Sequence, residues 1–324
     1  MAGRSAIVMW LEIVFLVFGL FILIFGGDLL VSGASNIALR MHISPLVVGL
    51  TIVAFGTSAP ELLISVKAAL TNSPDLTMGN VVGSNICNLA LVLGVISLIN
   101  NIPVRSDSIK IDWPVTMGSS LLLYFVVKEK EAFVSRIEGI LFIVLIISYT
   151  VFIIMRSRGK SLSVLPIDGI PDKVPQNRVW KDVAFILLGC IGLYFGAEWF
   201  VVGVKKMAET LGVSQRVIGI TVVAIGTSLP ELVTTVIASV RKETDLALGN
   251  LMGSNIFNIL SILGITSLIK EIEVNPVIIQ KDMVPMLGIT LFLLPLMLYK
   301  RELGKISGIL LLSLYVIYTY NVIT

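Results

Sequence analysis

The chain has 324 residues, of which 56% are hydrophobic and only 14% are charged, with a formal net charge of +3. A soluble domain carries roughly 25% charged residues, so this chain has too few to cover a water-soluble globule of its length. The composition excludes a cytosolic enzyme, a disulfide-rich secreted protein and a disordered chain. It indicates a protein that crosses the lipid bilayer several times.

Ten apolar segments of helical length follow one another along the chain. They cover residues 7–38, 44–70, 77–100, 113–127, 133–155, 182–204, 214–240, 246–269, 283–299 and 304–321. A membrane-crossing helix needs about 20 apolar residues, and the sequence lacks the alternation typical of a transmembrane β-barrel. The first segment is too long for a signal peptide, so we expect it to be retained. The predicted fold class is an all-α membrane protein with ten transmembrane helices.

The chain contains an internal repeat with an offset of 170 residues. Segment 49–68 (GLTIVAFGTSAPELLISVKA) matches 219–238 (GITVVAIGTSLPELVTTVIA), and 75–88 (DLTMGNVVGSNICN) matches 245–258 (DLALGNLMGSNIFN). Each copy holds five predicted spans, and because five is odd the second copy enters the membrane upside down. We therefore expect two inverted-topology repeats, 1–155 and 182–324, with a site between them at the membrane midplane.

The segment that joins the repeats, residues 156–181, is the longest predicted loop. The positive-inside rule places it in the cytoplasm, because it carries Arg156, Arg158, Lys160, Lys173, Arg178 and Lys181. Both termini then lie outside. We expect a multi-pass protein of the cell membrane in this orientation.

Cysteine, histidine and the basic residues exclude several kinds of site. Cys87 and Cys190 lie in apolar stretches without a CxxC pattern, so zinc and iron–sulfur sites are not expected. His42 is the only histidine, which excludes a proton relay built on histidines. Cys87 is more typical of a core residue than of a reactive thiol. The basic residues are scattered, which argues against a nucleic-acid partner.

The first duplicated motif is Gly-Thr-Ser-x-Pro-Glu, at 56–61 and 226–231, in the middle of apolar segments. Pro60 has no N–H, so it breaks the helix and frees the carbonyl of Gly56; the kink can also turn out the carbonyls of Ala54 and Thr57. A break at this depth is tolerated only where it is buried or lines a cavity. The motif therefore predicts polar backbone groups inside the membrane.

The motif also places one carboxylate in each repeat. Glu61 lies four residues after Thr57 and three after Ser58, on one helix face. A carboxylate inside a membrane is a functional candidate by default, and Glu61 and Glu231 should meet at the pseudo-two-fold axis. Such oxygen ligands suit Ca²⁺ and Na⁺. The alternative is a kinked helix whose Glu only hydrogen-bonds a neighbour, which the length and duplication of the motif disfavour.

The second duplicated motif is Gly-Asn-x-x-Gly-Ser-Asn-x-x-Asn, at 79–88 and 249–258. Asn80, Ser84 and Asn88 fall on one helix face, while the glycines are more typical of close helix packing. For Ser84 and Asn88 we favour an ion-ligand role. For Asn80 and Asn85 an interhelical hydrogen bond and a ligand role are equally compatible with the pattern.

These duplicated motifs resemble the two α-repeats of the cation/Ca²⁺ antiporter superfamily. The resemblance is greatest to its Na⁺/Ca²⁺ exchanger branch, particularly to the compact prokaryotic members of that branch. The resemblance covers essentially the whole chain. It implies a ten-helix antiporter rather than an enzyme, in which Na⁺ and Ca²⁺ compete for overlapping central sites. The transported ions and the lipid bilayer are the only expected partners; no cofactor and no protein partner is predicted.

The resemblance also implies the ion ligands. In the family, each motif Glu binds Ca²⁺ together with the motif Thr carbonyl, which here are Glu61 with Thr57 and Glu231 with Thr227. The Na⁺ ligands of the family correspond to Ala54, Ser58, Ser84, Ala224, Ser228 and Ser254. The last polar positions of the second motif are Asn88 and Asn258.

One departure from the family pattern bears on the choice of ions. Asn258 stands where K⁺-dependent relatives carry Asp, and the chain lacks the GN-x-x-E pattern of H⁺/Ca²⁺ exchangers. By resemblance, Asn258 disfavours K⁺ co-transport and leaves two formal charges at the centre. An H⁺-coupled or K⁺-dependent Ca²⁺ exchanger is kept as the main alternative. An intramembrane enzyme is a second one, disfavoured because the chain has no HExxH motif and no Cys/His set; a channel is a third.

Overall fold

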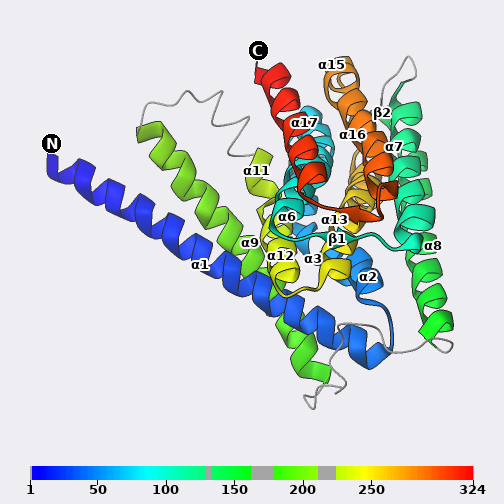
Figure 1. Ribbon diagram of the computed structural model, residues 1–324. Coiled ribbons are helices and arrows are strands. Elements are labelled where there is room, and N and C mark those ends of the chain that lie inside the picture. Colours follow the sequence, from blue (N-terminus) through cyan, green and yellow to red (C-terminus); the bar gives the residue numbers. More distant parts are fainter. Residues whose placement is uncertain (1, 129–132, 162–178, 211–223, 324) are drawn as a thin grey trace.

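The computed structural model describes residues 2–128, 133–161, 179–210 and 224–323, which are almost entirely helical (Figure 1). Among them, seven helices are long and apolar enough to cross a membrane, and one helix pair bent by 44° makes an eighth candidate. The expected all-α membrane protein is confirmed. The seven are Ile13–Met41, Pro74–Ile99, Arg136–Arg158, Val179–Thr210, Thr244–Ile269, Pro276–Leu298 and Lys305–Val322, and the bent pair is Pro45–Thr57 with Ala59–Leu70.

Two of the ten expected spans do not meet this test. Segment 113–127 forms α7 (Trp113–Val127), which has 15 residues and continues from the π-helical turn η3 (Ser108–Asp112). Segment 214–240 falls partly outside the described residues, which resume at α11 (Ala224–Thr227) and α12 (Leu229–Val240). The count of ten therefore stays a prediction.

Where both halves are described, equivalent helices and strands follow one another in the same order. The other elements of the first half are α1 (Ala2–Met41), α2 (Pro45–Val48), η1 (Gly49–Val53), α3 (Ala54–Thr57), α4 (Ala59–Leu70), α5 (Pro74–Ile86), η2 (Cys87–Val92), α6 (Leu93–Ile99), β1 (Ile102–Pro103), β2 (Phe133–Val134) and α8 (Arg136–Ser161). Those of the second half are α9 (Val179–Thr210), α13 (Thr244–Phe257), η5 (Asn258–Leu263), α14 (Gly264–Ile269), β3 (Ile272–Glu273), α15 (Pro276–Ile278), η6 (Ile279–Met283), α16 (Val284–Leu298), β4 (Glu302–Leu303) and α17 (Lys305–Ile323). Helices α12 and α13 begin 170 residues after α4 and α5, as the repeat predicts.

Two short antiparallel strand pairs connect the halves. Strand β1 pairs with β4, with Ile102 opposite Leu303, and β2 pairs with β3, with Val134 opposite Ile272. All four of these residues are buried. Each pair thus fixes a loop of one half to a loop of the other, although strands of two residues are too short to show a pattern in the sequence.

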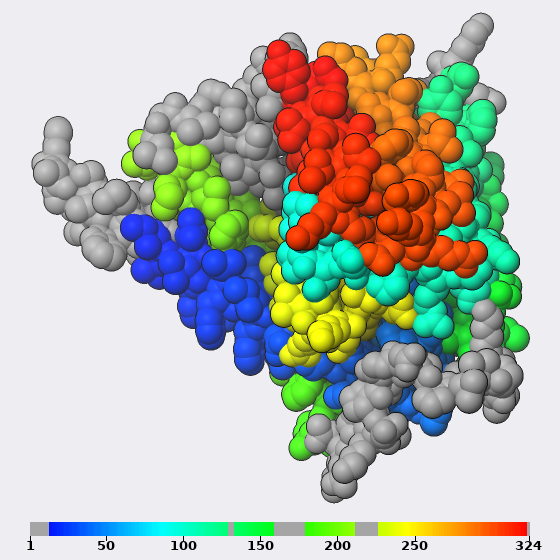
Figure 2. Space-filling view, in the orientation of Figure 1, coloured from blue at the N-terminus to red at the C-terminus, as the bar shows by residue number. Residues whose placement is uncertain are grey.

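The long helices α1 and α9 pack directly against each other and slant across the remaining helices (Figures 1 and 2). A Cβ atom on Gly19 would lie 2.4 Å from the backbone nitrogen of Phe200, and one on Gly33 would lie 2.7 Å from the carbonyl oxygen of Asp182. The two helices are therefore antiparallel, because contacts further along α1 fall further back in α9. Gly26 lies midway between these contacts and also faces the backbone of α9.

A polar stripe on α1 joins this helix pair to the turn between α12 and α13. Arg241 forms an ion pair with Asp28, and its Nη1 donates a hydrogen bond of 2.8 Å to Ser32 Oγ. Ser35 donates to the carboxylate of Glu243. Because Asp28, Ser32 and Ser35 fall on one face of α1, these five residues form one contact, which we call the α1–core connection.

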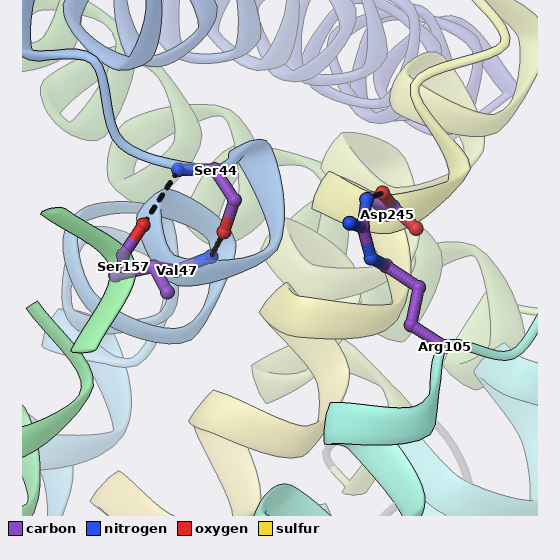
Figure 3. A network of polar contacts seen from close by, with 5 residues as sticks. All are labelled: Ser44, Val47, Arg105, Ser157 and Asp245. Carbon is purple, nitrogen blue, oxygen red and sulfur yellow. Dashed lines mark hydrogen bonds and ion pairs between the residues drawn. The ribbon is translucent and has the colours of Figure 1, made fainter. Parts of the chain in front are cut away.

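Other polar contacts fix helix ends near the same part of the molecule (Figure 3). The hydroxyl of Ser44 caps α2 by accepting from the backbone N–H of Val47 at 3.4 Å, and the N–H of Ser44 donates to Ser157 of α8 at 2.9 Å. Arg105 forms an ion pair of 2.8 Å with Asp245 in the first turn of α13. The Ser44 cap satisfies a backbone N–H that the start of a helix leaves without a partner, whereas the Arg105–Asp245 pair joins two side chains.

Glycines of the second motif bring α13 against α2 and η1. A Cβ on Gly249 would lie 2.4 Å from the carbonyl oxygen of Leu46, and one on Gly253 would lie 2.7 Å from the Cα of Leu50. The close packing expected of this motif is confirmed in the second half. A Cβ added to the matching Gly79 or Gly83 would meet no described atom of another segment within 4 Å. The residues that correspond to α2 and η1 in the repeat fall within 211–223, outside the described residues.

The contact between α1 and α9 generates a prediction about stability. A Cβ on Gly196 would lie 2.6 Å from the backbone nitrogen of Leu23, so we expect Gly196→Ala to force the helices apart and to lower the free energy of unfolding by about 1–3 kcal/mol. Thermal unfolding in detergent measures the change. The matched control is Gly288→Ala, where no described atom lies within 4 Å and where alanine should not destabilise the helix. Equal melting temperatures for the two variants would contradict the prediction.

Candidate functional site

Each half carries a broken helix at its Gly-Thr-Ser-x-Pro-Glu motif. Helix α3 ends at Thr57 and α4 begins at Ala59, with Pro60 in its first turn and a bend of 44° between the two. The same break recurs between α11 and α12. The predicted helix breaks are thus confirmed in both copies. Glu61 and Glu231 lie in the first turns of α4 and α12, where the helix dipole favours a negative charge.

The two glutamates are fully buried and lie near enough for their charges to influence each other. Both are 0% exposed, and the electrostatic influence of Glu231 reaches Glu61. Both carboxylate oxygens of Glu61 and Oε2 of Glu231 have no hydrogen-bond partner among the described residues. A buried, unpartnered carboxylate costs several kcal/mol, so this arrangement requires a cation or protons between the two groups.

Hydroxyl groups from both halves surround the Glu231 carboxylate. Ser58 Oγ donates to its Oε1 at 3.2 Å, and Ser254 Oγ donates to the same oxygen at 3.4 Å. Thr57 Oγ1 lies 3.3 Å from Ser254 Oγ. The structure therefore brings together four of the residues selected from the sequence, two from each half.

Of the remaining hydroxyl candidates, two contact each other and one has no described partner. Ser84 Oγ is 3.5 Å from Thr227 Oγ1, a contact at the limit of a hydrogen bond. Ser228 is 1% exposed, and its hydroxyl has no partner within hydrogen-bonding distance among the described residues. Buried hydroxyls with unused lone pairs are available to a cation.

The asparagines at the end of the second motif are also buried and only partly bonded. Asn88 is 0% exposed, and neither atom of its amide has a described partner. Asn258 donates from Nδ2 to Asn85 Oδ1 at 3.1 Å, which leaves its own Oδ1 without a described partner. Both residues stand at the π-helical turns η2 and η5, and such turns are frequent at functional sites.

At the two alanine positions, Ala54 and Ala224, the candidate ligand is a backbone carbonyl and not a side-chain hydroxyl. The carbonyl of Ala54 accepts from the backbone N–H of Ser58 at 3.0 Å and from Thr57 Oγ1 at 3.3 Å. The kink has therefore not turned this carbonyl away from its own helix, contrary to the expectation from the sequence. Ala224 begins α11, and its surroundings lie outside the described residues.

Asn80 and Asn85, for which the sequence left two roles open, form interhelical hydrogen bonds. Asn80 Nδ2 donates to the Glu61 carbonyl at 3.2 Å and to Ser65 Oγ at 3.0 Å. Asn85 Nδ2 donates to the Asn255 carbonyl at 3.3 Å. These contacts favour the packing role for both, with Asn80 holding the backbone of a cage residue in place.

Sequence reasoning missed Asn250, which is the repeat partner of Asn80. Its Oδ1 accepts from Thr57 Oγ1 at 3.2 Å, and its Nδ2 donates to Thr234 and Thr235 at 3.2 and 3.0 Å. It is 1% exposed. Asn250 thus orients a candidate ligand of the other half, and its repeat position was the signal that could have identified it.

Hydrogen-bonding contacts join Glu231, Ser58, Ser254, Thr57 and Asn250 into one buried group of oxygen atoms. We call this group, together with the nearby carboxylate of Glu61, the cage. No group of three or more His, Cys, Asp or Glu side chains occurs in the described part of the chain, so the other oxygens are neutral hydroxyls, amides and carbonyls. Ca²⁺ takes 6–8 oxygen ligands of this kind, and soft transition metals prefer nitrogen and sulfur. The chemistry of the cage suits hard cations.

Comparison with known proteins agrees with this chemistry. The chain is 33% identical to the sodium/calcium exchanger MaX1 of Methanosarcina acetivorans, over 93% of this chain and 95% of that protein. It is 32% identical to the inner membrane protein YrbG of Escherichia coli, over 96% of both chains. The structure of the sodium-calcium exchanger NCX_Mj superposes with a TM-score of 0.81, at 32% identity, over 97% of this chain and 99% of that chain.

The chain also matches the family described as sodium/calcium exchanger protein, over residues 11–155 and 181–324. The matched segments cover both copies of the repeat and both broken helices. Members of this family are transporters and not enzymes. The chain therefore belongs to the sodium/calcium exchanger family.

Proposed function

We propose that this protein is a secondary active antiporter that exchanges Na⁺ for Ca²⁺ across the membrane by alternating access. The observation that carries the proposal is the pair of fully buried glutamates, Glu61 and Glu231, which have three carboxylate oxygens unpartnered among the described residues. They lie at equivalent helix breaks in the two halves. Family membership and the names of similar proteins support the same ions.

The exchange of one ion for the other follows from the charge of the cage. Glu61 and Glu231 carry −2 when both are ionised, which one Ca²⁺ or two Na⁺ neutralise. If Ca²⁺ and two Na⁺ were bound at the same time, the cage would carry an excess of positive charge in a medium of low dielectric constant, which is strongly unfavourable. The empty cage carries a net charge of −2, which is equally unfavourable. Only the loaded cage is therefore expected to change access, which couples the two ion movements.

The proposed ligands are the residues selected from the sequence. Glu61 and Glu231 with the carbonyls of Thr57 and Thr227 would hold Ca²⁺. The sites for Na⁺ would use the oxygen atoms of Ala54, Ser58, Ser84, Ala224, Ser228 and Ser254, and Asn88 and Asn258 complete the cage. For Ala54 and Ala224 the ligand is a backbone carbonyl, and that of Ala54 must exchange a hydrogen bond for an ion.

We further propose that residues 1–155 and 182–324 are two inverted five-helix repeats joined by a cytoplasmic segment, 156–181. The ends of this segment are helical and not loop, because α8 continues to Ser161 and α9 begins at Val179. The antiparallel packing of α1 on α9, which are equivalent in the two halves, supports the inversion. The strand pairs β1–β4 and β2–β3, each between the halves, support an assembly in which neither half is complete alone. Both termini would then lie outside a cell membrane.

Helices α1 and α9 are the proposed moving pair. They contribute none of the proposed ligands, and their seam of glycines allows backbone contact between them without interlocking side chains. The α1–core connection holds them to the core at the end that we place in the cytoplasm. Its Arg241 and Glu243 correspond to Thr71 and Ser73 in the other half, which cannot form the same ion pair.

Replacing either glutamate tests the proposed site. Purified protein in proteoliposomes loaded with Na⁺ should take up Ca²⁺ when diluted into Na⁺-free medium. Glu61→Gln and Glu231→Gln should each abolish this uptake, because one remaining carboxylate does not balance Ca²⁺. Glu302→Gln, which changes an exposed carboxylate on β4 outside the cage, is the control and should retain uptake. Transport by both Gln variants at the parent rate would exclude the assignment.

The same vesicles distinguish the alternatives. Uptake that requires K⁺ would indicate a K⁺-dependent exchanger, and uptake driven by a pH gradient without Na⁺ would indicate H⁺ coupling. We expect neither, because Asn258 supplies no third carboxylate. Accumulation of Ca²⁺ against its gradient excludes a channel.

A crosslink tests the moving pair. The double variant Asp28→Cys/Arg241→Cys places two thiols at the α1–core connection, and a short thiol crosslinker should stop Na⁺/Ca²⁺ exchange there until it is cleaved. The control is Ile102→Cys/Leu303→Cys, which joins β1 to β4 within the core and should leave exchange running. Continued exchange with the first crosslink complete on a gel would show that α1 does not move relative to the core.

A further inference from the structure

A chain of buried hydrogen bonds connects the two helix breaks. Thr57 Oγ1, at the end of α3, donates to Asn250 Oδ1 at 3.2 Å, and Asn250 Nδ2 donates to Thr234 Oγ1 at 3.2 Å. Thr234 Oγ1 in turn donates to the carbonyl of Pro230 at 2.6 Å, with the carbonyl of Glu231 at 3.2 Å. The three side chains in this chain are at most 1% exposed. One broken helix is thus bonded to the other inside the protein.

The direction of each bond follows from the last acceptor in the chain. A backbone carbonyl can only accept, so Thr234 uses its single hydroxyl proton on Pro230 or Glu231. Its oxygen then accepts from Asn250, which must present the nitrogen of its amide there and not the oxygen. The amide oxygen is thereby directed at Thr57, and among the described residues no other donor lies within hydrogen-bonding distance of it. Thr57 is therefore the donor, because a buried amide oxygen without a donor costs free energy.

The hydroxyl of Thr57 has one proton and two further neighbours that could receive it. Its Oγ1 lies 3.3 Å from the carbonyl oxygen of Ala54 and 3.3 Å from Ser254 Oγ. Both of these oxygens are proposed Na⁺ ligands, and a proton directed at either of them opposes a cation there. Asn250 Oδ1 is not a proposed ligand. Thr57 can thus turn its proton toward Asn250 when Na⁺ takes the other two oxygens.

The equivalent positions in the first half are different. Ile64 stands at the position of Thr234, and its side chain has no hydroxyl group. Asn80, the repeat partner of Asn250, donates directly to the carbonyl of Glu61 at 3.2 Å. Thr234 therefore acts on one side of the cage, and its removal should alter one group of ligands rather than all of them.

We infer that Thr234 is a positioning residue for Na⁺ binding. Acting through Asn250, it holds the hydroxyl proton of Thr57 away from the two proposed Na⁺ ligands beside it, so that their lone pairs remain available to the ion. Ca²⁺ depends less on Thr234, because the proposed Ca²⁺ ligand of Thr57 is its backbone carbonyl and not its hydroxyl. This inference rests on the proposed function, because it explains how the same cage binds one of its two ions.

Separate measurements for the two ions test the inference. In the vesicle assay we measure the concentrations of Na⁺ and of Ca²⁺ that give half-maximal exchange. Thr234→Val replaces the hydroxyl by a methyl group and should raise the ratio of the Na⁺ to the Ca²⁺ concentration roughly 2- to 10-fold, the effect of one hydrogen bond. Thr234→Ser keeps a hydroxyl and should restore the parent ratio. The matched control is Thr290→Val, which removes a buried hydroxyl that donates to the Met286 carbonyl at 2.8 Å outside the cage.

A parent ratio in Thr234→Val, or an equal shift in Thr234→Ser or Thr290→Val, would overturn the inference. Asn250→Leu removes the acceptor itself and should shift the ratio in the same direction, so it decides the question if Thr234→Val does not fold. In the double variant, Thr234→Val should add nothing to the effect of Asn250→Leu, because both act through the same bond. A further shift in the double variant would show that Thr234 acts by another route.

A binding measurement separates this inference from the proposed function. In detergent, an ion that binds the folded protein raises its melting temperature. Thr234→Val should need more Na⁺, but not more Ca²⁺, than the parent for the same rise. If the parent takes up no Ca²⁺ under a Na⁺ gradient, the proposed exchange fails, while this measurement still decides whether Thr234 positions ligands for Na⁺. A parent melting temperature that Na⁺ leaves unchanged would overturn the inference as well.

Discussion

The repulsion between two buried carboxylates is the constraint on which the rest of the structure depends. Glu61 and Glu231 are fully buried, and among the described residues the hydrogen bonds to their carboxylates come from hydroxyl groups and none from a basic side chain. The site is therefore stable only when cations or protons occupy it. An antiporter needs this property, since an empty carrier that could change access freely would dissipate the gradient.

The surrounding architecture follows from holding these charges at one point. A carboxylate placed in the first turn of a helix benefits from the helix dipole, and a helix can begin inside the membrane only if the chain is broken there. Proline provides the break, and the neighbouring Thr and Ser supply hydroxyls to the freed region. Close approach of α13 to η1 through Gly249 and Gly253 then brings the second half near enough for Ser254 to reach Thr57.

The sequence was sufficient to predict the helical membrane class, the broken helices and the two buried carboxylates. Each of these features follows from residues that are close together in the sequence, and each pattern occurs in both copies of the repeat. It did not predict Asn250 as the partner of Thr57, since the choice of hydrogen-bond partner depends on which helices meet. The strand pairs were missed because two residues carry no periodicity. Cys87 was assigned to the core from its apolar neighbours in sequence, and it is 2% exposed within the hydrophobic core.

The differences between the halves carry as much information as their likeness. Asn250 bonds the hydroxyl of Thr57, whereas Asn80 bonds the backbone of Glu61, and only one half supplies the Arg241 and Glu243 that hold α1. If the molecule were strictly symmetric, its inward-facing and outward-facing states would have equal energy. The Asp28–Arg241 ion pair has no counterpart in the other half, so it can stabilise one of the two states more than the other. Because this ion pair is partly exposed, the resulting energy difference between the states is about 0–1 kcal/mol. A bias of this size sets a resting orientation without preventing the change of access.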